Sequence, residues 1–422
     1  MSNQESRKSF IKKASGAVIA GTVYGNSSFA ISKKKPTLRV LGTHVTLQEE
    51  LRKQASKDLG INLVFEPMGS AAVLQKATSK PASFDIYEQW SDSINILWQA
   101  KAIQSIDIDR IKYWDEINGL AKTGKVTAKA RVGKGDAPNK LLYIQKNKSL
   151  GSQQTKNVSF LPYVHNVDSF GYNTNFIKKG IPYETESWAW LLDKKYKGKV
   201  GLVNAPTIGI FDLALSAEAS GLMKFKDIGN MSIKEIDQLF AILYKKKAQG
   251  HFAGFWGSVP QSVEFMVNKR VWIESMFSPG VSSARGKGVP VTYASPKEGY
   301  RAWHGVMCLS SKTTGYVKDA AYEYMNWWLS GYPGAFIAQQ GYYISNAKRS
   351  KPLLTQNEWD YWYDGKVAKE DLKGTDGLVS VKKGEFRDGG SYTKRFSNIA
   401  VWNSVMDNYD YSLDKWYELL NN

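Results

Sequence analysis

The sequence contains a single cysteine, Cys308, among its 422 residues. One thiol excludes an intramolecular disulfide and any zinc site built from several thiolates. Histidine is almost as scarce, and no two histidines stand at the helical spacing typical of metal ligands. The four histidines are His44, His165, His251 and His304. The sequence therefore predicts neither a disulfide framework nor a bound metal ion.

Catalytic and phosphate-binding motifs are also absent. The sequence has no Gly-x-x-x-x-Gly-Lys-Ser/Thr loop, no Gly-x-Gly-x-x-Gly after a predicted strand and no Gly-x-Ser-x-Gly. A Ser/His/Asp set can still assemble from distant parts of a chain, so a secreted hydrolase on a two-lobed scaffold stays an alternative. The absence of motifs favours a binding protein with no catalytic residues and no cofactor.

Long apolar segments are missing after the first thirty residues, so we expect no membrane span in the mature chain. Residues 1–30 are basic at first, weakly apolar over 14–23, and end on Ser28-Phe29-Ala30. This order is typical of an export signal peptide. Residues 6–12 resemble a twin-arginine export motif in which Lys8 stands in place of the second arginine, which leaves the export route open.

Positive charge, in contrast, is abundant. The chain has 57 Lys and Arg against 39 Asp and Glu, a net charge of +18. Such a balance can indicate a nucleic-acid partner. The basic residues are mostly lysines scattered along the chain, however, and no arginine-rich stripe occurs. We therefore expect a solvated lysine-rich surface and no nucleic acid.

Short apolar runs alternate with helical patterns after Pro36. Strands are predicted at 37–41, 61–65 and 84–87, with helices at 47–59 and 71–78 between them. This alternation indicates a parallel sheet covered by helices. A long polar stretch over 123–157 is predicted to be an irregular excursion.

A second α/β unit is predicted to begin near Asp168. Its strands are expected at 199–203, 271–275 and 291–294, and a Ser232-x-x-Glu235 capping box opens a helix that stops at Gly250. The chain then returns through a strand at 305–310. No flexible linker separates the two units, so we expect several crossings between two lobes and a ligand cleft between them.

Several segments then occur in an order that identifies a family. These are Leu161–Val164 followed by Gly171–Asn173, Glu186–Leu192 followed by Tyr196–Val200, Pro296–Gly299, and Gly341–Asn346. In these segments the chain resembles the periplasmic substrate-binding proteins of ABC importers, in the spermidine/putrescine-binding branch, over residues 37 to 346. The resemblance implies a type II periplasmic binding protein fold, an α/β fold of two lobes that close on a small solute.

The resemblance also implies the location and the partners. We expect a periplasmic, monomeric protein that delivers its solute to a membrane permease and performs no chemistry on it. The first lobe is expected at 31–168 plus about 305–345. The second lobe is expected at 169–304 plus about 346–422, where the segment from Ala347 is a C-terminal extension that wraps the lobes.

The expected pocket matches the family only in part. Polyamine binders of this family use carboxylates and aromatic walls, because a buried ammonium group needs a negative partner or a π face. The strand end Val203–Gly209 has no carboxylate, and His304 stands where the resemblance places an Asp. The aromatic wall is partly kept, through Trp90, Trp256, Phe277 and Trp303. We assign to the cleft Thr43, His44, Gln89, Trp90, Ser91, Asn204, Thr207, Trp256, Glu274, Phe277, Trp303 and His304.

Three classes of solute fit this set. An aromatic cage suits a quaternary ammonium or betaine, and histidine with amide donors suits a small anion such as a phosphonate, sulfonate or carboxylate. A polyamine fits if Glu274, Glu88 or Asp92 reaches inward. The family resemblance favours the amine-type solute. Asp85 and Asp168 are expected to hold backbone or hinge geometry instead.

Overall fold

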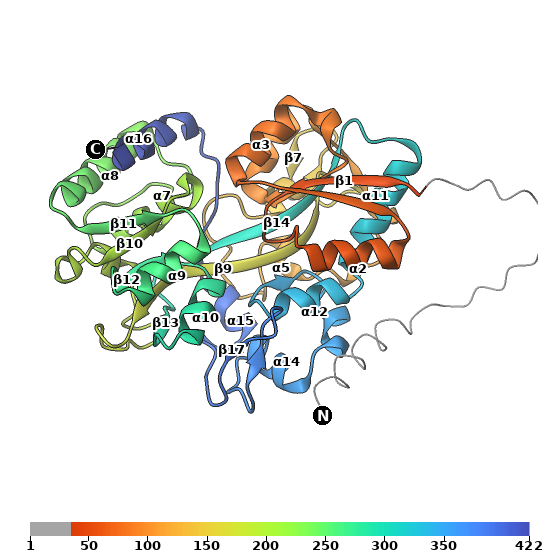
Figure 1. The fold of residues 1–422 in the computed structure, drawn as a ribbon. Coiled ribbons are helices and arrows are strands. Elements are labelled where there is room, and N and C mark those ends of the chain that lie inside the picture. Colours follow the sequence, from red (N-terminus) through yellow and green to blue (C-terminus); the bar gives the residue numbers. More distant parts are fainter. Residues whose placement is uncertain (1–34, 422) are drawn as a thin grey trace, which may run out of the picture.

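The computed structural model describes residues 35–421 (Figure 1), so the predicted signal peptide lies outside the described residues. One mixed sheet runs through the molecule in the order β11-β10-β12-β9-β14-β3-β1-β2. The helices of two lobes lie on either side of its long central strands. The predicted α/β class is confirmed.

The first lobe is built on three parallel strands. They are β1 (Thr37–Gly42), β2 (Asn62–Pro67) and β3 (Ile86–Trp90). Helices α2 (Glu49–Leu59), α3 (Ser70–Ser79) and α11 (Gly315–Trp328) pack against them. Helix α2 ends at Gly60, whose φ of 65° is the left-handed conformation that glycine adopts without strain. The predicted strands and helices of this lobe are present.

The second lobe repeats the pattern. Its strands are β10 (Val200–Val203), β11 (Phe252–Trp256) and β12 (Ile273–Met276). Its helices are α7 (Pro206–Ala219), α8 (Ile233–Ala248), α9 (Val259–Val267) and α10 (Ser278–Gly286). The capping box of Ser232 and Glu235 is present at the start of α8. Helices α7, α9 and α10 each begin just after a parallel strand, so their N-termini gather at one edge of the sheet.

Two long antiparallel strands cross between the lobes. These are β9 (Leu161–Asn173) and β14 (Tyr300–Ser310), and every residue in them is buried. The first part of β9 pairs with β14, and its second part pairs with β12 and β13 (Val291–Tyr293). The predicted return strand began only at Gly305. The strand itself begins five residues earlier, at Tyr300. The sequence prediction missed this part because the polar residues Arg301 and His304 interrupt the apolar run, although both are buried where the strands cross.

The C-terminal extension contacts both lobes. It contains α14 (Gln356–Trp362), β16 (Leu372–Lys373), β17 (Val379–Val381), α15 (Tyr392–Phe396), β18 (Ile399–Trp402) and α16 (Tyr409–Asn421). Strand β18 pairs in parallel with the start of β14, and α16 packs on α7 and α8 of the second lobe. Helix α14, strand β17 and helix α15 lie below β9 in Figure 1, and β17 packs against α10.

The polar stretch over 123–157 contains more structure than the sequence predicted, and it shares a small sheet with a strand that precedes it. Strands β5 (Ile106–Asp107), β6 (Tyr143–Ile144), β7 (Leu150–Gly151) and β8 (Asn157–Val158) form a small separate sheet. Lys134 forms a parallel bridge with Val401 of β18. This bridge places residues 134–136 beside the C-terminal crossing.

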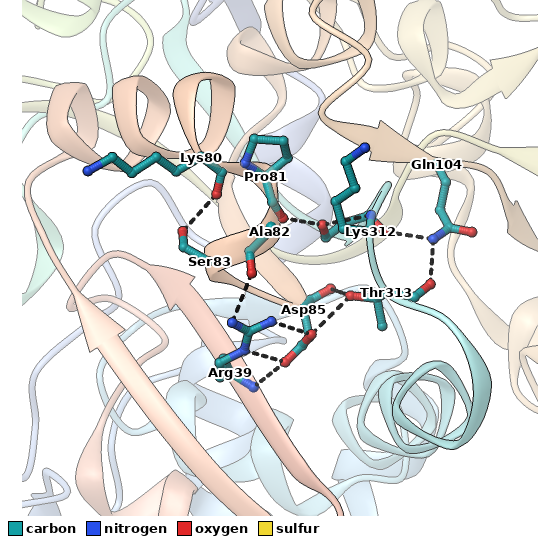
Figure 2. A network of polar contacts seen from close by, with 10 residues as sticks. Arg39, Lys80, Pro81, Ala82, Ser83, Asp85, Gln104, Lys312 and Thr313 are labelled. Carbon is teal, nitrogen blue, oxygen red and sulfur yellow. Dashed lines mark hydrogen bonds and ion pairs between the residues drawn. The ribbon is translucent and has the colours of Figure 1, made fainter.

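Asp85 connects three segments of the first lobe (Figure 2). Its carboxylate accepts hydrogen bonds from the backbone N and the Nε and Nη2 atoms of Arg39, at 2.9, 3.0 and 2.9 Å. It also accepts a 3.1 Å bond from Oγ1 of Thr313, beyond the end of β14. The expectation that Asp85 holds backbone geometry is confirmed.

We predict that Asp85→Ala lowers the free energy of unfolding by about 2 kcal/mol or more, because charged hydrogen bonds to a buried acceptor are lost. Urea denaturation measures this change. The control is Asp319→Ala, which removes an exposed ion pair with Arg110 and should cost less than about 1 kcal/mol. Equal losses in the two variants would contradict the role of Asp85.

Candidate functional site

Three aromatic side chains meet where the first lobe joins the crossing strands. Trp90 ends β3, Trp303 lies on β14, and Tyr342 follows α12 (Tyr332–Ala338). The ring centroids of Trp90 and Trp303 are 4.6 Å apart, and those of Trp303 and Tyr342 are 5.7 Å apart. Both contacts are edge-on, the geometry that aromatic pairs favour. We call this set the aromatic row.

The alternation of side chains along β14 sorts its polar residues onto two faces. Arg301 and Trp303 stand opposite Asp168 and Asn166 of β9, and this is the front face, which carries the aromatic row. His304 stands opposite His165 on the rear face. The C-terminal extension covers the rear face, because Tyr392 and Phe396 contact His165.

A buried ion network lies on the front face beside the aromatic row. Nε1 of Trp303 donates a 2.8 Å hydrogen bond to Asp168, and the hydroxyl of Tyr293 donates to the same carboxylate at 3.1 Å. Arg301 lies between this carboxylate and Asp212 of α7, at 3.7 and 2.7 Å. One arginine therefore serves two carboxylates, a local excess of one negative charge.

Burial decides how these groups titrate. Burial raises the pKa of Asp212 to about 6, and the Arg301 guanidinium only partly opposes this rise. Burial also raises the pKa of Asp168, again against the effect of Arg301. Both carboxylates are sealed from solvent, and burial opposes their ionisation while Arg301 favours it.

Two further carboxylates lie at the end of β3. Asp92, in the turn directly after Trp90, is only 5% exposed. Burial, together with the charge of Asp136, raises the pKa of Asp92 to about 7. Burial likewise raises the pKa of Asp136 to about 6. Among residues 35–421, neither carboxylate has a basic side chain within ion-pair distance. We call these two residues the acidic pair.

A cavity of about 620 Å³ opens next to the acidic pair. It is lined by Lys134, Lys226, Asp227, Asn230, Met231, Ser232, Glu235, Asp407 and Asn408. Gly229 of the second lobe and Gly135 approach so closely that a Cβ on Gly229 would lie 2.2 Å from the Gly135 nitrogen. The charges of Asp227 and Asp407 act on Asp136 and raise its pKa further. Carboxylates from both lobes therefore face one region.

Other predicted site residues lie at the edges of the two parallel sheets. Thr43 is buried and His44 is exposed after β1. Gln89 is held by the hydroxyl of Tyr87, and Ser91 donates to the backbone oxygen of Asp136 at 3.3 Å. In the second lobe, Asn204 is exposed and accepts from Trp416, and Thr207 lies in the first turn of α7.

Trp256 and Phe277 pack edge to face, with ring centroids 5.1 Å apart, in a separate apolar cluster of the second lobe. No contact joins them to the aromatic row among the described residues. Gly341 and the second lobe approach each other closely, because a Cβ atom added to Gly341 would lie 2.5 Å from Oγ of Ser278, the residue after Phe277. The predicted aromatic wall is thus divided between the lobes.

Two predicted site residues are not part of this arrangement. His304 is fully buried on the rear face, where its ring stacks on His165 at 4.9 Å and burial lowers its pKa to about 4. Neighbouring residues of a strand point to opposite faces, so Trp303 and His304 do not serve one ligand from the same side. The assignment of His304 to the cleft is therefore corrected.

Glu274 is also placed elsewhere. Its side chain is fully buried, accepts a 2.8 Å hydrogen bond from Ser262 of α9, and has its pKa raised well above the ordinary value by burial. It lies on β12 in the second lobe. Glu88 is similarly enclosed, with the hydroxyls of Tyr163 and Tyr324 donating to it at 3.0 and 2.8 Å. The third acid considered from the sequence, Asp92, lies two residues after Trp90, and it interacts electrostatically with Asp136 and Tyr87.

Sequence reasoning missed Arg301, Asp212, Asp136 and Tyr342 as site residues. No local signal identifies the first three, because their partners are far away in the sequence. Tyr342 lies in the segment Gly341–Asn346, on which the family resemblance partly rests. Among residues 35–421, no group of three His, Cys, Asp or Glu side chains is arranged to hold a metal ion. In the same residues no helix has the length and apolarity to cross a membrane.

The sequence model of the bacterial extracellular solute-binding proteins matches residues 50–361. The chain belongs to this family. No curated protein sequence matches it significantly. Its family membership confirms the relationship that the ordered sequence segments indicated.

Solved structures of other solute-binding proteins share the fold at low identity. The spermidine/putrescine ABC transporter substrate-binding protein PotD of Streptococcus pneumoniae is 16% identical, with 91% of this chain and 98% of that chain covered at a TM-score of 0.61. A putative spermidine/putrescine ABC transporter from Listeria monocytogenes is 14% identical, with 91% and 99% covered at 0.65. AgtB of A. tumefaciens R10, in complex with agropinic acid, is 13% identical, with 92% and 99% covered at 0.56. The two-lobed fold is thereby confirmed.

The acidic pair generates a prediction about pH. Folded Asp92 keeps its proton up to about pH 7, whereas an unfolded aspartate releases it near pH 4. The native state therefore binds more protons in this window, and its stability decreases as the pH rises from about 4 to about 7. Asp92→Asn should reduce this decrease, measured by urea denaturation across the window. An unchanged decrease in the variant would contradict the burial of an unpaired Asp92.

Proposed function

We propose that the protein is the solute-binding component of an ABC importer and that it captures an amine-type solute. In this proposal the chain is exported by the signal peptide of residues 1–30, acts in the periplasm as a monomer, and delivers the solute to a membrane permease. It has no enzymatic activity. The family and the two-lobed fold support the general role, and the front face supports the class of solute.

The observation that carries the amine proposal is the unpaired acidic pair at the end of β3, the strand that ends on Trp90 of the aromatic row. Burying carboxylates without a positive partner is unfavourable, which is why their pKa values are raised. A bound ammonium group would supply that partner, and Trp90, Trp303 and Tyr342 offer apolar and π faces for its methylene groups. The negative excess at Asp168, Arg301 and Asp212 acts in the same direction.

The alternatives differ in what they need from the site. A betaine or other quaternary ammonium would use the aromatic row without a carboxylate, so it is the second candidate. A small anion would face the acidic pair and the network of Asp168 and Asp212, while His304 lies on the rear face. The electrostatics of the front face thus oppose an anion. A hydrolase would need a nucleophile and a base in contact, and the front face offers carboxylates and aromatic rings instead.

A thermal-shift screen of residues 31–422 tests the proposal. The panel contains putrescine, spermidine, betaines, amino acids, sulfonates, phosphonates and ferric citrate. A solute that binds only the folded protein raises the melting temperature. We expect a rise with amines. A rise with betaines alone would mean that the aromatic row binds the solute without the acidic pair. A rise with anions alone would overturn the proposal.

Calorimetry of the amine that shifts most then tests the residues. Asp92→Asn should weaken binding by at least about tenfold, because a charged hydrogen bond to the ammonium is lost. The matched control is Glu274→Gln, a buried acid away from the aromatic row, which should leave the affinity unchanged. If Glu274→Gln weakens binding and Asp92→Asn does not, the ammonium lies in the second lobe and the placement proposed here is wrong.

A further inference from the structure

Two buried arginines of the C-terminal extension have no carboxylate partner. Three arginines in the described chain are almost fully buried, and they are Arg301, Arg387 and Arg395, at 0%, 6% and 1% exposure. Arg301 lies between two carboxylates on the front face. Within residues 35–421, no carboxylate oxygen lies within 4.0 Å of either Arg387 or Arg395. A buried charge without a partner is costly, so the rear face needs an explanation.

Both guanidinium groups converge on the hydroxyl of Tyr343. Nη2 of Arg387 lies 3.4 Å from this oxygen, and Nη1 of Arg395 lies 3.1 Å from it. Their remaining acceptors are backbone carbonyls, Gly341 for Arg387 at 3.5 Å and Val167 for Arg395 at 3.2 Å. Two positive charges are therefore held on either side of one neutral oxygen atom.

The Nε atom of each arginine is also without an acceptor. Both Nε atoms are sealed from solvent and form no hydrogen bond. A guanidinium has five N–H donors, and a buried donor without an acceptor is unusual in a native protein. Water could accept these hydrogen bonds, but it would leave both positive charges uncompensated.

Tyr343 does not supply the missing negative charge. Although burial raises it, the pKa of Tyr343 is lowered overall by Arg387 and Arg395. The hydroxyl nevertheless donates a 2.8 Å hydrogen bond to the backbone oxygen of Trp362, so its proton is in use. The aromatic faces of Trp362 and Tyr300, 4.6 and 5.6 Å from the two guanidinium carbons, attract cations without neutralising them.

The nearest carboxylates are engaged elsewhere. Asp388 and Glu385 lie beside Arg285 of α10, at 2.5 and 3.6 Å. Asp168 and Asp212 lie beside Arg301 on the front face. The extension therefore has its own acidic partners for α10, but none in contact with Arg387 or Arg395.

We propose that the rear face holds a small inorganic anion between Arg387 and Arg395, next to Tyr343. The anion accepts hydrogen bonds from the free guanidinium N–H groups and neutralises the two charges. Because the guanidinium groups share one phenol oxygen and are enclosed, the anion is of halide size.

Bromide is the direct probe. Crystals of residues 31–422 soaked in bromide should show an anomalous peak within hydrogen-bond distance of Nε of Arg387 or Arg395. In solution, chloride should raise the melting temperature above that in gluconate at equal ionic strength. The absence of a bromide peak at these nitrogens overturns the proposal, whatever the variants do.

Substitutions test whether the two arginines bind the anion. In Arg387→Met, the chloride concentration that gives a stated rise in melting temperature should increase at least about tenfold. The control is Arg131→Met, which removes an exposed arginine that donates to a backbone oxygen and changes the net charge equally. An equal chloride response in the two variants contradicts the site. A tyrosinate absorbance band at neutral pH that Tyr343→Phe removes also contradicts it, because Tyr343 would then be the counter-charge.

Discussion

The antiparallel pairing of β9 with β14 is the constraint on which the rest of the structure depends. Both strands are buried along their whole length, yet they carry Asp168, Arg301 and His304 where they pair. Such residues are tolerated in an interior only when they find partners. Arg301 finds Asp168 within the crossing and Asp212 on α7, so the same ion network that satisfies the strands also fixes the second lobe against them.

The fold could largely be predicted from the sequence because its lobes repeat a local pattern. Apolar strands followed by helical spacing, and the capping box at Ser232, are visible within a few residues. The two crossing strands were harder to predict from the sequence. The start of β14 was missed because Arg301 and His304 interrupt its apolar run, and their partners Asp212 and His165 lie far away along the chain. Ion pairs over such separations leave no periodic signal in a sequence.

The site was predictable in its aromatic part only. Trp90 and Trp303 were expected together and lie 4.6 Å apart. The assignment of His304 to the cleft did not take into account that neighbouring side chains of a strand point to opposite faces, so His304 and Trp303 lie on different faces of β14. Glu274 was chosen as the retained carboxylate, but it lies enclosed in the second lobe. Asp92 and Asp136 lie far apart in the sequence, and only the folded chain shows that they act on each other.

The crossing strands separate charges of opposite sign. On the front face, Asp168 and Asp212 share one arginine. At the end of β3, Asp92 and Asp136 have no basic partner within ion-pair distance among the described residues. On the rear face, Arg387 and Arg395 have no carboxylate in contact. Arg395 still acts on Asp168 through the sheet and opposes the rise in its pKa. The extension therefore does more than cover the strands, because the charge of Arg395 favours the ionised form of a front-face carboxylate. A cation bound at the front and an anion bound at the rear would each reduce the charge that the other face must balance.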